Sequence, residues 1–68
     1  MDNNIEKLEA IIYKRLNELN SNSFPLVYQM INTKTGKQKI FERIKSMIMF
    51  EGYENIESCI NSIENSSN

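Results

Sequence analysis

Residues 36–51, Gly-Lys-Gln-Lys-Ile-Phe-Glu-Arg-Ile-Lys-Ser-Met-Ile-Met-Phe-Glu, hold the longest unbroken apolar periodicity of this 68-residue chain and its densest positive charge. At about 100° per residue, five apolar side chains fall within an arc of roughly 120°, which is the width of a core-facing stripe. Charged and polar side chains fill the opposite side. The stretch therefore predicts a long amphipathic helix, whose stripe consists of Ile40, Phe41, Ile44, Met47 and Ile48.

Residues that favour helix ends stand on both sides of this stretch. Thr35 is a candidate N-cap, and its spacing from Gln38 is that of a capping box. Gly52 is a candidate for the position just after the helix, where a left-handed backbone is common. We therefore expect the helix to run over 36–51.

Met49 and Phe50 do not belong to the apolar stripe. On an ideal helical wheel both lie among the charged residues. Burying one such side chain is worth roughly 1.5–3 kcal/mol, so we expect something to cover the pair. The sequence leaves two covers open, the following segment 53–65 or a partner molecule.

Three further segments show helical patterns. The first, 4–20, has an apolar stripe that begins at Ile5 and ends at Leu19. The second, 24–32, has Pro25 in its first turn and Ser23 as the expected cap. The third, 55–65, has Asn55 as its expected cap and apolar residues at the i, i+3, i+4, i+7 positions.

No segment alternates apolar and polar residues long enough to predict a strand. We therefore expect an all-α fold, a small compact bundle or orthogonal array of three to four helices. The chain is short enough for a single domain, 1–68, with 1–3 and 66–68 frayed. The predicted core comprises Leu8, Ile12, Leu16, Val27, Ile40, Ile44, Ile48, Ile56, Ile60 and Ile63.

The composition argues against catalysis. The chain has no histidine, which removes the commonest general base and the usual zinc ligand. Cys59, the only cysteine, lies on the apolar stripe of the last predicted helix, so we expect a small buried hydrophobe. We predict a protein that is not an enzyme and has no catalytic, cofactor-binding or metal-binding residue, no cofactor and no small-molecule substrate.

The sequence also bears on location and source. It has no basic, apolar leader and no apolar run near the ~20 residues that span a bilayer, so we expect a cytoplasmic protein without membrane contact. A lone thiol fits a reducing compartment. Ten asparagines, ten isoleucines and six lysines against two arginines fit AT-rich coding, which is typical of a low-GC bacterium or its phage.

A basic run supports one function class, binding to nucleic acid. Residues 34–45 carry five basic groups and one acidic group, whereas 46–68 carry four acidic groups and no basic one. Basic groups can bind phosphates through counterion release. However, the chain is net acidic, and the polar linker 32–35 with bulky Met30 and Ile31 does not suit a helix-turn-helix. The candidate contacts are Lys34, Lys37, Lys39, Arg43 and Lys45.

The preferred hypothesis is a protein-interaction or regulatory module. Four large side chains lie off the apolar stripes, and Tyr, Phe and Met are enriched in the cores of interfaces. A domain this small also gains stability from self-association, so a homodimer is the expected assembly. The candidate partner contacts are Tyr13, Tyr28, Met49 and Phe50.

Overall fold

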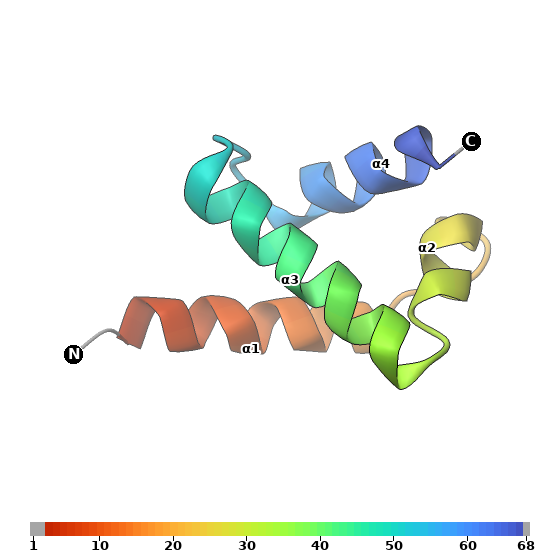
Figure 1. Cartoon of the computed structure of the whole chain (residues 1–68), viewed down its shortest axis with the longest axis horizontal. Coiled ribbons are helices and arrows are strands. Elements are labelled where there is room, and N and C mark those ends of the chain that lie inside the picture. Colours follow the sequence, from red (N-terminus) through yellow and green to blue (C-terminus); the bar gives the residue numbers. More distant parts are fainter. Residues whose placement is uncertain (1–2, 68) are drawn as a thin grey trace.

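The computed structural model describes residues 3–67, and within this range the chain forms four helices and no strand. They are α1 (Asn3–Asn17), α2 (Pro25–Met30), α3 (Lys34–Phe50) and α4 (Ile56–Ser66) (Figure 1). The predicted all-α fold is confirmed. Of the ends expected to fray, Met1, Asp2 and Asn68 lie outside the described residues.

Helix α3 is the element on which the others pack, because it contacts α1, α2 and α4. It crosses α1 obliquely, with α2 beside its N-terminal end (Figure 1). The two long helices run antiparallel: Lys37 of α3 is hydrogen-bonded to Asn17, the last residue of α1, whereas Lys45 is hydrogen-bonded to Glu9, about two turns earlier. The long amphipathic helix predicted from the sequence is thus the centre of the fold.

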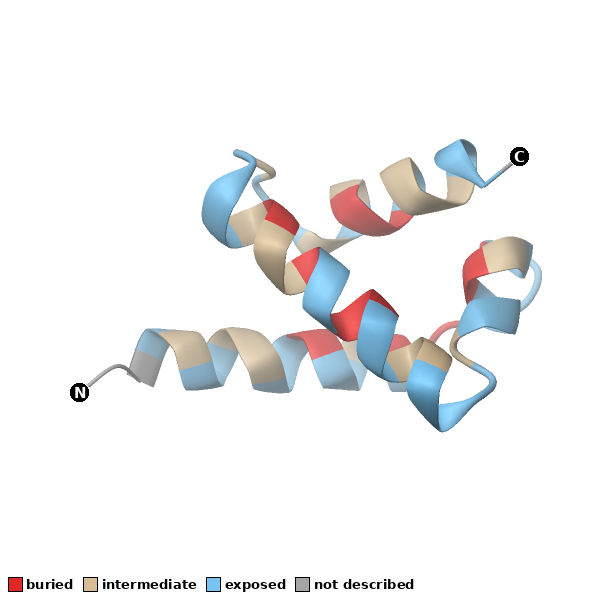
Figure 2. Ribbon diagram, viewed as in Figure 1, coloured by how far each residue is buried: buried red, intermediate tan, exposed pale blue. Residues whose placement is uncertain are grey.

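The core consists of side chains from all four helices and from the loop before α2. Figure 2 shows the buried segments on the sides of the helices that face one another. Six predicted core residues are buried, and Leu8, Ile48, Ile56 and Ile63 are partly buried at its margin. Phe24, outside any periodic pattern, was not predicted. The buried set is Ile12, Leu16, Leu19, Phe24, Val27, Ile40, Phe41, Ile44, Met47, Cys59 and Ile60.

The start of α3 differs from the prediction. Thr33, not Thr35, is the N-cap, and its hydroxyl oxygen accepts a hydrogen bond from the Gly36 N–H at 3.0 Å. The expected capping box is absent from the described residues, because Gln38 instead donates to Glu42. Only three residues, 31–33, therefore separate α2 from α3.

Gly36 is the physical reason for this earlier start. A Cβ atom at this position would lie 1.9 Å from the Met30 carbonyl oxygen and 2.9 Å from the Thr33 hydroxyl oxygen. The first turn of α3 can thus lie directly against the last turn of α2. This close approach of two backbones needs a residue without a side chain.

The start of α2 also differs from the prediction. Ser23 is not its cap; Phe24 occupies that position and makes no side-chain hydrogen bond to the helix. The carboxylate of Glu64 on α4 accepts from the N–H groups of Leu26 (3.1 Å) and Val27 (2.9 Å) instead. A residue of another helix therefore supplies the cap, in the place where a negative charge also suits the helix dipole.

The signals predicted at the end of α3 and at the start of α4 are confirmed, whereas α2 ends at Met30 and not at the predicted residue 32. Gly52 has φ +82°, the left-handed conformation expected just after α3, and the Tyr53 N–H donates to the Met47 carbonyl at 3.3 Å. Asn55 caps α4 by accepting from the Ser58 N–H at 2.8 Å. Helix α1 ends at Asn17, earlier than the predicted residue 20, because the chain turns at Glu18.

Replacing Gly36 with alanine is expected to destabilise the protein. Alanine is normally better than glycine inside a helix by about 0.5–1 kcal/mol. At Gly36 the sign reverses, because the new methyl group would overlap the Met30 carbonyl oxygen. Urea unfolding followed by circular dichroism measures the change, with Ser46→Ala in the same helix as the control. A more stable Gly36→Ala protein would show that α2 and α3 do not pack this closely.

Removing the Glu64 carboxylate is expected to cost about 1 kcal/mol, the usual value for the loss of an N-cap. Glu64→Ala leaves the N–H groups of Leu26 and Val27 without their acceptor. Glu54→Ala, which removes an exposed carboxylate from the loop before α4, is the matched control. Equal unfolding free energies of the two variants would contradict the capping role.

Candidate interaction surface

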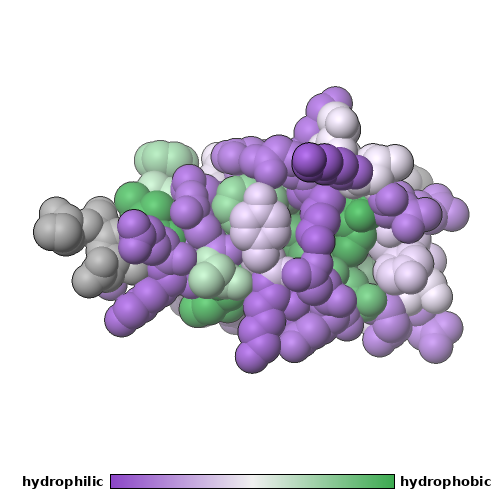
Figure 3. Space-filling view, turned by 90° about the horizontal axis from the view of Figure 1, so that it is seen from below, coloured by the Kyte–Doolittle hydropathy of each residue, from purple (hydrophilic) through white to green (hydrophobic). Residues whose placement is uncertain are grey.

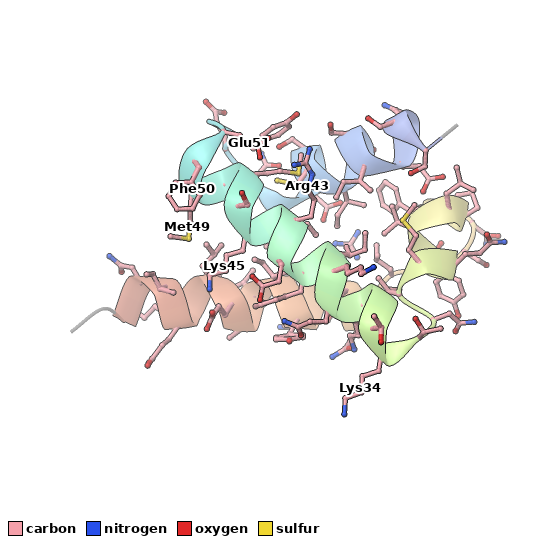
Figure 4. The ribbon with its side chains drawn as sticks, in the orientation of Figure 1. Lys34, Arg43, Lys45, Met49, Phe50 and Glu51 are labelled. Carbon is pink, nitrogen blue, oxygen red and sulfur yellow. The ribbon has the colours of Figure 1, made fainter. Side chains whose placement is uncertain are left out.

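Met49 and Phe50 form the candidate site, at the C-terminal end of α3 (Figure 4). Phe50 is 77% exposed and Met49 is 39% exposed. Residues 53–65 leave Phe50 largely uncovered, whereas the folded chain covers more than half of Met49. Figure 3 shows hydrophobic side chains at the end of the molecule that carries the N-terminal half of α1.

Charges of both signs surround this end of α3. Arg43 lies two turns before Phe50, on the same side of the helix. Its guanidinium donates to the Glu51 carboxylate at 3.3 Å, and both side chains remain partly exposed. On the side facing α1, Lys45 donates to Glu9 at 2.6 Å, and this hydrogen bond raises the pKa of Lys45.

Tyr13 has a structural role inside the fold. Its ring stacks on that of Phe41, with the ring centroids 4.2 Å apart, and its hydroxyl donates to Gln38 at 2.9 Å. These contacts join α1 to α3 and account for a large side chain that lies off the α1 stripe. Tyr13 therefore has partners without any second molecule.

Tyr28 lies at the other end of the molecule. It lines a pocket of about 220 Å³ together with Asn17 and Lys37, among other residues. Lys37 precedes Phe50 by thirteen residues of α3, which corresponds to roughly 20 Å along the helix. The structure thus places Met49 and Phe50 together and does not bring either predicted tyrosine to them.

The five basic residues of the run 34–45 are spread around α3. Lys37 and Lys45 face α1, where they bond to Asn17 and Glu9. Arg43 is paired with Glu51. Within residues 3–67, only Lys34 and Lys39 of this set make neither an ion pair nor a side-chain hydrogen bond. The run does not form one continuous basic face.

Two features at the surface were not predicted. Ile11 of α1 is 55% exposed. Arg15 of α1 and Glu57 of α4 form a two-pronged ion pair, in which the second contact, from Nη2 to Oε1, is 3.1 Å. A pair separated by 42 positions leaves no local spacing signal, so the sequence could not reveal it.

The structure also shows the surroundings of the thiol and of the acidic side chains. Cys59 is fully buried in the core, as expected of a small hydrophobe, and this burial raises the pKa of its thiol. Among residues 3–67, no three acidic or cysteine side chains come together in a way that could hold a metal ion. None of the described helices has the length and apolarity needed to cross a membrane.

Comparisons with protein-family models, with curated proteins and with solved structures found no match to this chain.

The Arg15–Glu57 pair gives the protein a predicted pH dependence. Its hydrogen bonds lower the pKa of Glu57, so the pair stabilises the fold above the ordinary glutamate pKa of about 4.3. This stability is lost as the pH falls through the lowered pKa. Because the side chains are 31% and 50% exposed, we expect no more than about 1 kcal/mol.

The measurement is the free energy of unfolding in urea at pH 7 and at pH 3. Glu57→Gln should lower stability at pH 7 and flatten the decline towards pH 3. Glu54→Gln is the control, because Glu54 makes no ion pair within residues 3–67. If the two variants show the same pH dependence, the pair does not contribute.

Proposed function

We propose that this chain is a non-catalytic protein-interaction module that associates with a second copy of itself through the C-terminal end of α3. The observation that carries the proposal is the 77% exposure of Phe50, beside the partly exposed Met49. Phenylalanine and methionine are enriched in interface cores. A cytoplasmic location is part of the proposal, because a single buried thiol suits a reducing compartment.

The energetics support an intermolecular cover for this pair. Full burial of one such side chain is worth roughly 1.5–3 kcal/mol, a large fraction of the stability of a small domain. Four side chains of the α3 stripe, Ile40, Phe41, Ile44 and Met47, are already buried without Phe50, so the core does not need this side chain. A partner that covers them gains this free energy without disturbing the packing of the helices.

Nucleic-acid binding is the second candidate, and one observation favours it. Helices α2 and α3 are joined by a three-residue turn with Gly36 at their closest approach, and a three- to four-residue turn is typical of a helix-turn-helix. Lys34 and Lys39 are exposed on the second helix. However, hydrogen bonds or ion pairs within the chain already engage the other three basic side chains, those of Lys37, Arg43 and Lys45. We therefore rank this function second.

The double substitution Met49→Ser/Phe50→Ser tests the first proposal. Both side chains are exposed in the single chain, so the variant is expected to keep its fold and to lose self-association. Sedimentation velocity gives the oligomeric state, and circular dichroism confirms the helix content. Ile11→Ser, which alters an exposed apolar side chain on α1, is the matched control and should associate like the wild type.

Three outcomes overturn the proposal. The first is a wild-type protein that stays monomeric at high micromolar concentration. The second is a folded double variant that associates as the wild type does. The third is an unfolded double variant, which would give Met49 and Phe50 a role in the core. A monomeric wild type that binds DNA, with affinity falling as salt rises, would favour the second candidate.

A further inference from the structure

A pocket lies where the ends of three helices meet, at the end of the molecule away from Phe50. The last turn of α1, the end of α2 and the first turns of α3 surround it, and its volume is about 220 Å³ (Figure 1). This volume exceeds that of the roughly 150 Å³ cavity that can hold benzene, but it is smaller than the roughly 300–1,000 Å³ of sites for drug-sized ligands. The pocket therefore suits a small organic molecule.

Apolar side chains contribute little to the open wall of the pocket. Leu16 and Leu19 belong to its lining but are only 1% and 7% exposed, and Ile31 is partly buried against the core. Polar atoms form most of the wall that solvent can reach. An apolar ligand would remove water from these atoms without replacing its hydrogen bonds, which is costly. A ligand that fits this pocket must therefore be polar.

Lys37 and Asn17 give the wall an excess of hydrogen-bond donors. The Lys37 ammonium donates to Asn17 Oδ1, and this bond fixes the charged group between α1 and α3. An ammonium group has three N–H donors, and within residues 3–67 Lys37 uses one of them. Because the side-chain oxygen of Asn17 is engaged, its NH2 group is left to donate. Both side chains thus offer donors to an acceptor such as a carboxylate.

Two further polar side chains of the lining can donate or accept. The Tyr28 hydroxyl and the Asn32 side-chain amide are exposed, and neither makes a hydrogen bond within residues 3–67. Among the described residues, no acidic side chain lines the pocket. Lys37 therefore supplies the only side-chain charge of the described lining, and its counter-ion must come from the ligand.

We infer that this pocket binds a small hydroxycarboxylate. The carboxylate pairs with the Lys37 ammonium and accepts from the Asn17 NH2 group, in charge-assisted hydrogen bonds. The hydroxyl groups of the ligand bond to Tyr28 and Asn32, which can both donate and accept. A single positive charge matches a single carboxylate. The inference concerns binding without a reaction.

This site is separate from the proposed self-association. Lys37 lies roughly 20 Å along α3 from Phe50, so the pocket can be filled while the end of α3 is covered. A ligand in the pocket contacts α1, α2 and α3 at once. Binding to the folded chain alone therefore raises the midpoint of thermal unfolding as the ligand concentration rises.

A series of matched ligands tests the inference on the wild-type protein. Glycerate carries a carboxylate and hydroxyl groups, propionate lacks the hydroxyls, and glycerol lacks the carboxylate. Two-dimensional NMR of the isotopically labelled chain, at constant ionic strength, locates and quantifies binding. Glycerate should shift the signals of Asn17, Asn32 and Lys37, with a dissociation constant on the order of 10 mM for a molecule of about seven non-hydrogen atoms.

The comparison ligands should bind more weakly. Glycerol should lose at least about tenfold in affinity, because it has no charge to pair with Lys37. Propionate should lose about threefold, because it makes no hydrogen bond through a hydroxyl.

Variants of the lining test the same contacts from the side of the protein. Lys37→Met keeps the length of the side chain and removes its charge, so glycerate should bind at least about tenfold more weakly. Lys39→Met, which removes an exposed charge from the same helix, is the matched control and should bind glycerate like the wild type. Tyr28→Phe should weaken glycerate about threefold and leave propionate unchanged.

Four outcomes overturn the inference. The first is the absence of saturable shifts at the lining residues with glycerate. The second is equal affinity for glycerate and glycerol, and the third is equal affinity for glycerate and propionate. The fourth is a folded Lys37→Met variant that binds glycerate as tightly as the wild type. If circular dichroism shows that Lys37→Met is unfolded, the wild-type ligand series decides alone. None of these results bears on the oligomeric state, so the proposed function stands or falls separately.

Discussion

Burial of the apolar stripe of α3 is the interaction on which the rest of the structure depends. A chain of 68 residues can form only one small core. Helix α3 contributes Ile40, Phe41, Ile44 and Met47 to that core and contacts each of the other helices. Helices α1, α2 and α4 therefore have a common neighbour, and the position of α3 fixes which of their side chains can meet.

Local sequence patterns predicted the four helices because each apolar stripe is a property of its own segment. The starts of α2 and α3, however, depended on tertiary contacts. Thr33 and Thr35 could both cap α3. Capping by Thr33 places Gly36 against the Met30 carbonyl. At α2 the acceptor is Glu64, almost forty positions away. A reading of neighbouring residues could not have found either arrangement.

At the candidate site, too, some features follow from the local sequence and others depend on tertiary contacts. The exposure of Met49 and Phe50 could be predicted, because a helical wheel shows which side chains lie off the stripe. The role of Tyr13 could not, because its stacking on Phe41 depends on the register between α1 and α3. That register also brings Lys45 to Glu9 and thereby removes a charge from the basic run.

Core and interface compete for the same apolar side chains in a protein with a single small core. A residue that served both would tie association to folding, since its substitution would remove the dimer by unfolding the chain. On α3, the side chains that form the core and those available for an interface lie on different sides of the helix. Ile44 is fully buried on one side, whereas Phe50 is largely exposed on another. The fold is thus complete without the exposed pair, and the surface that carries the proposed function can change while the packing of the helices stays intact.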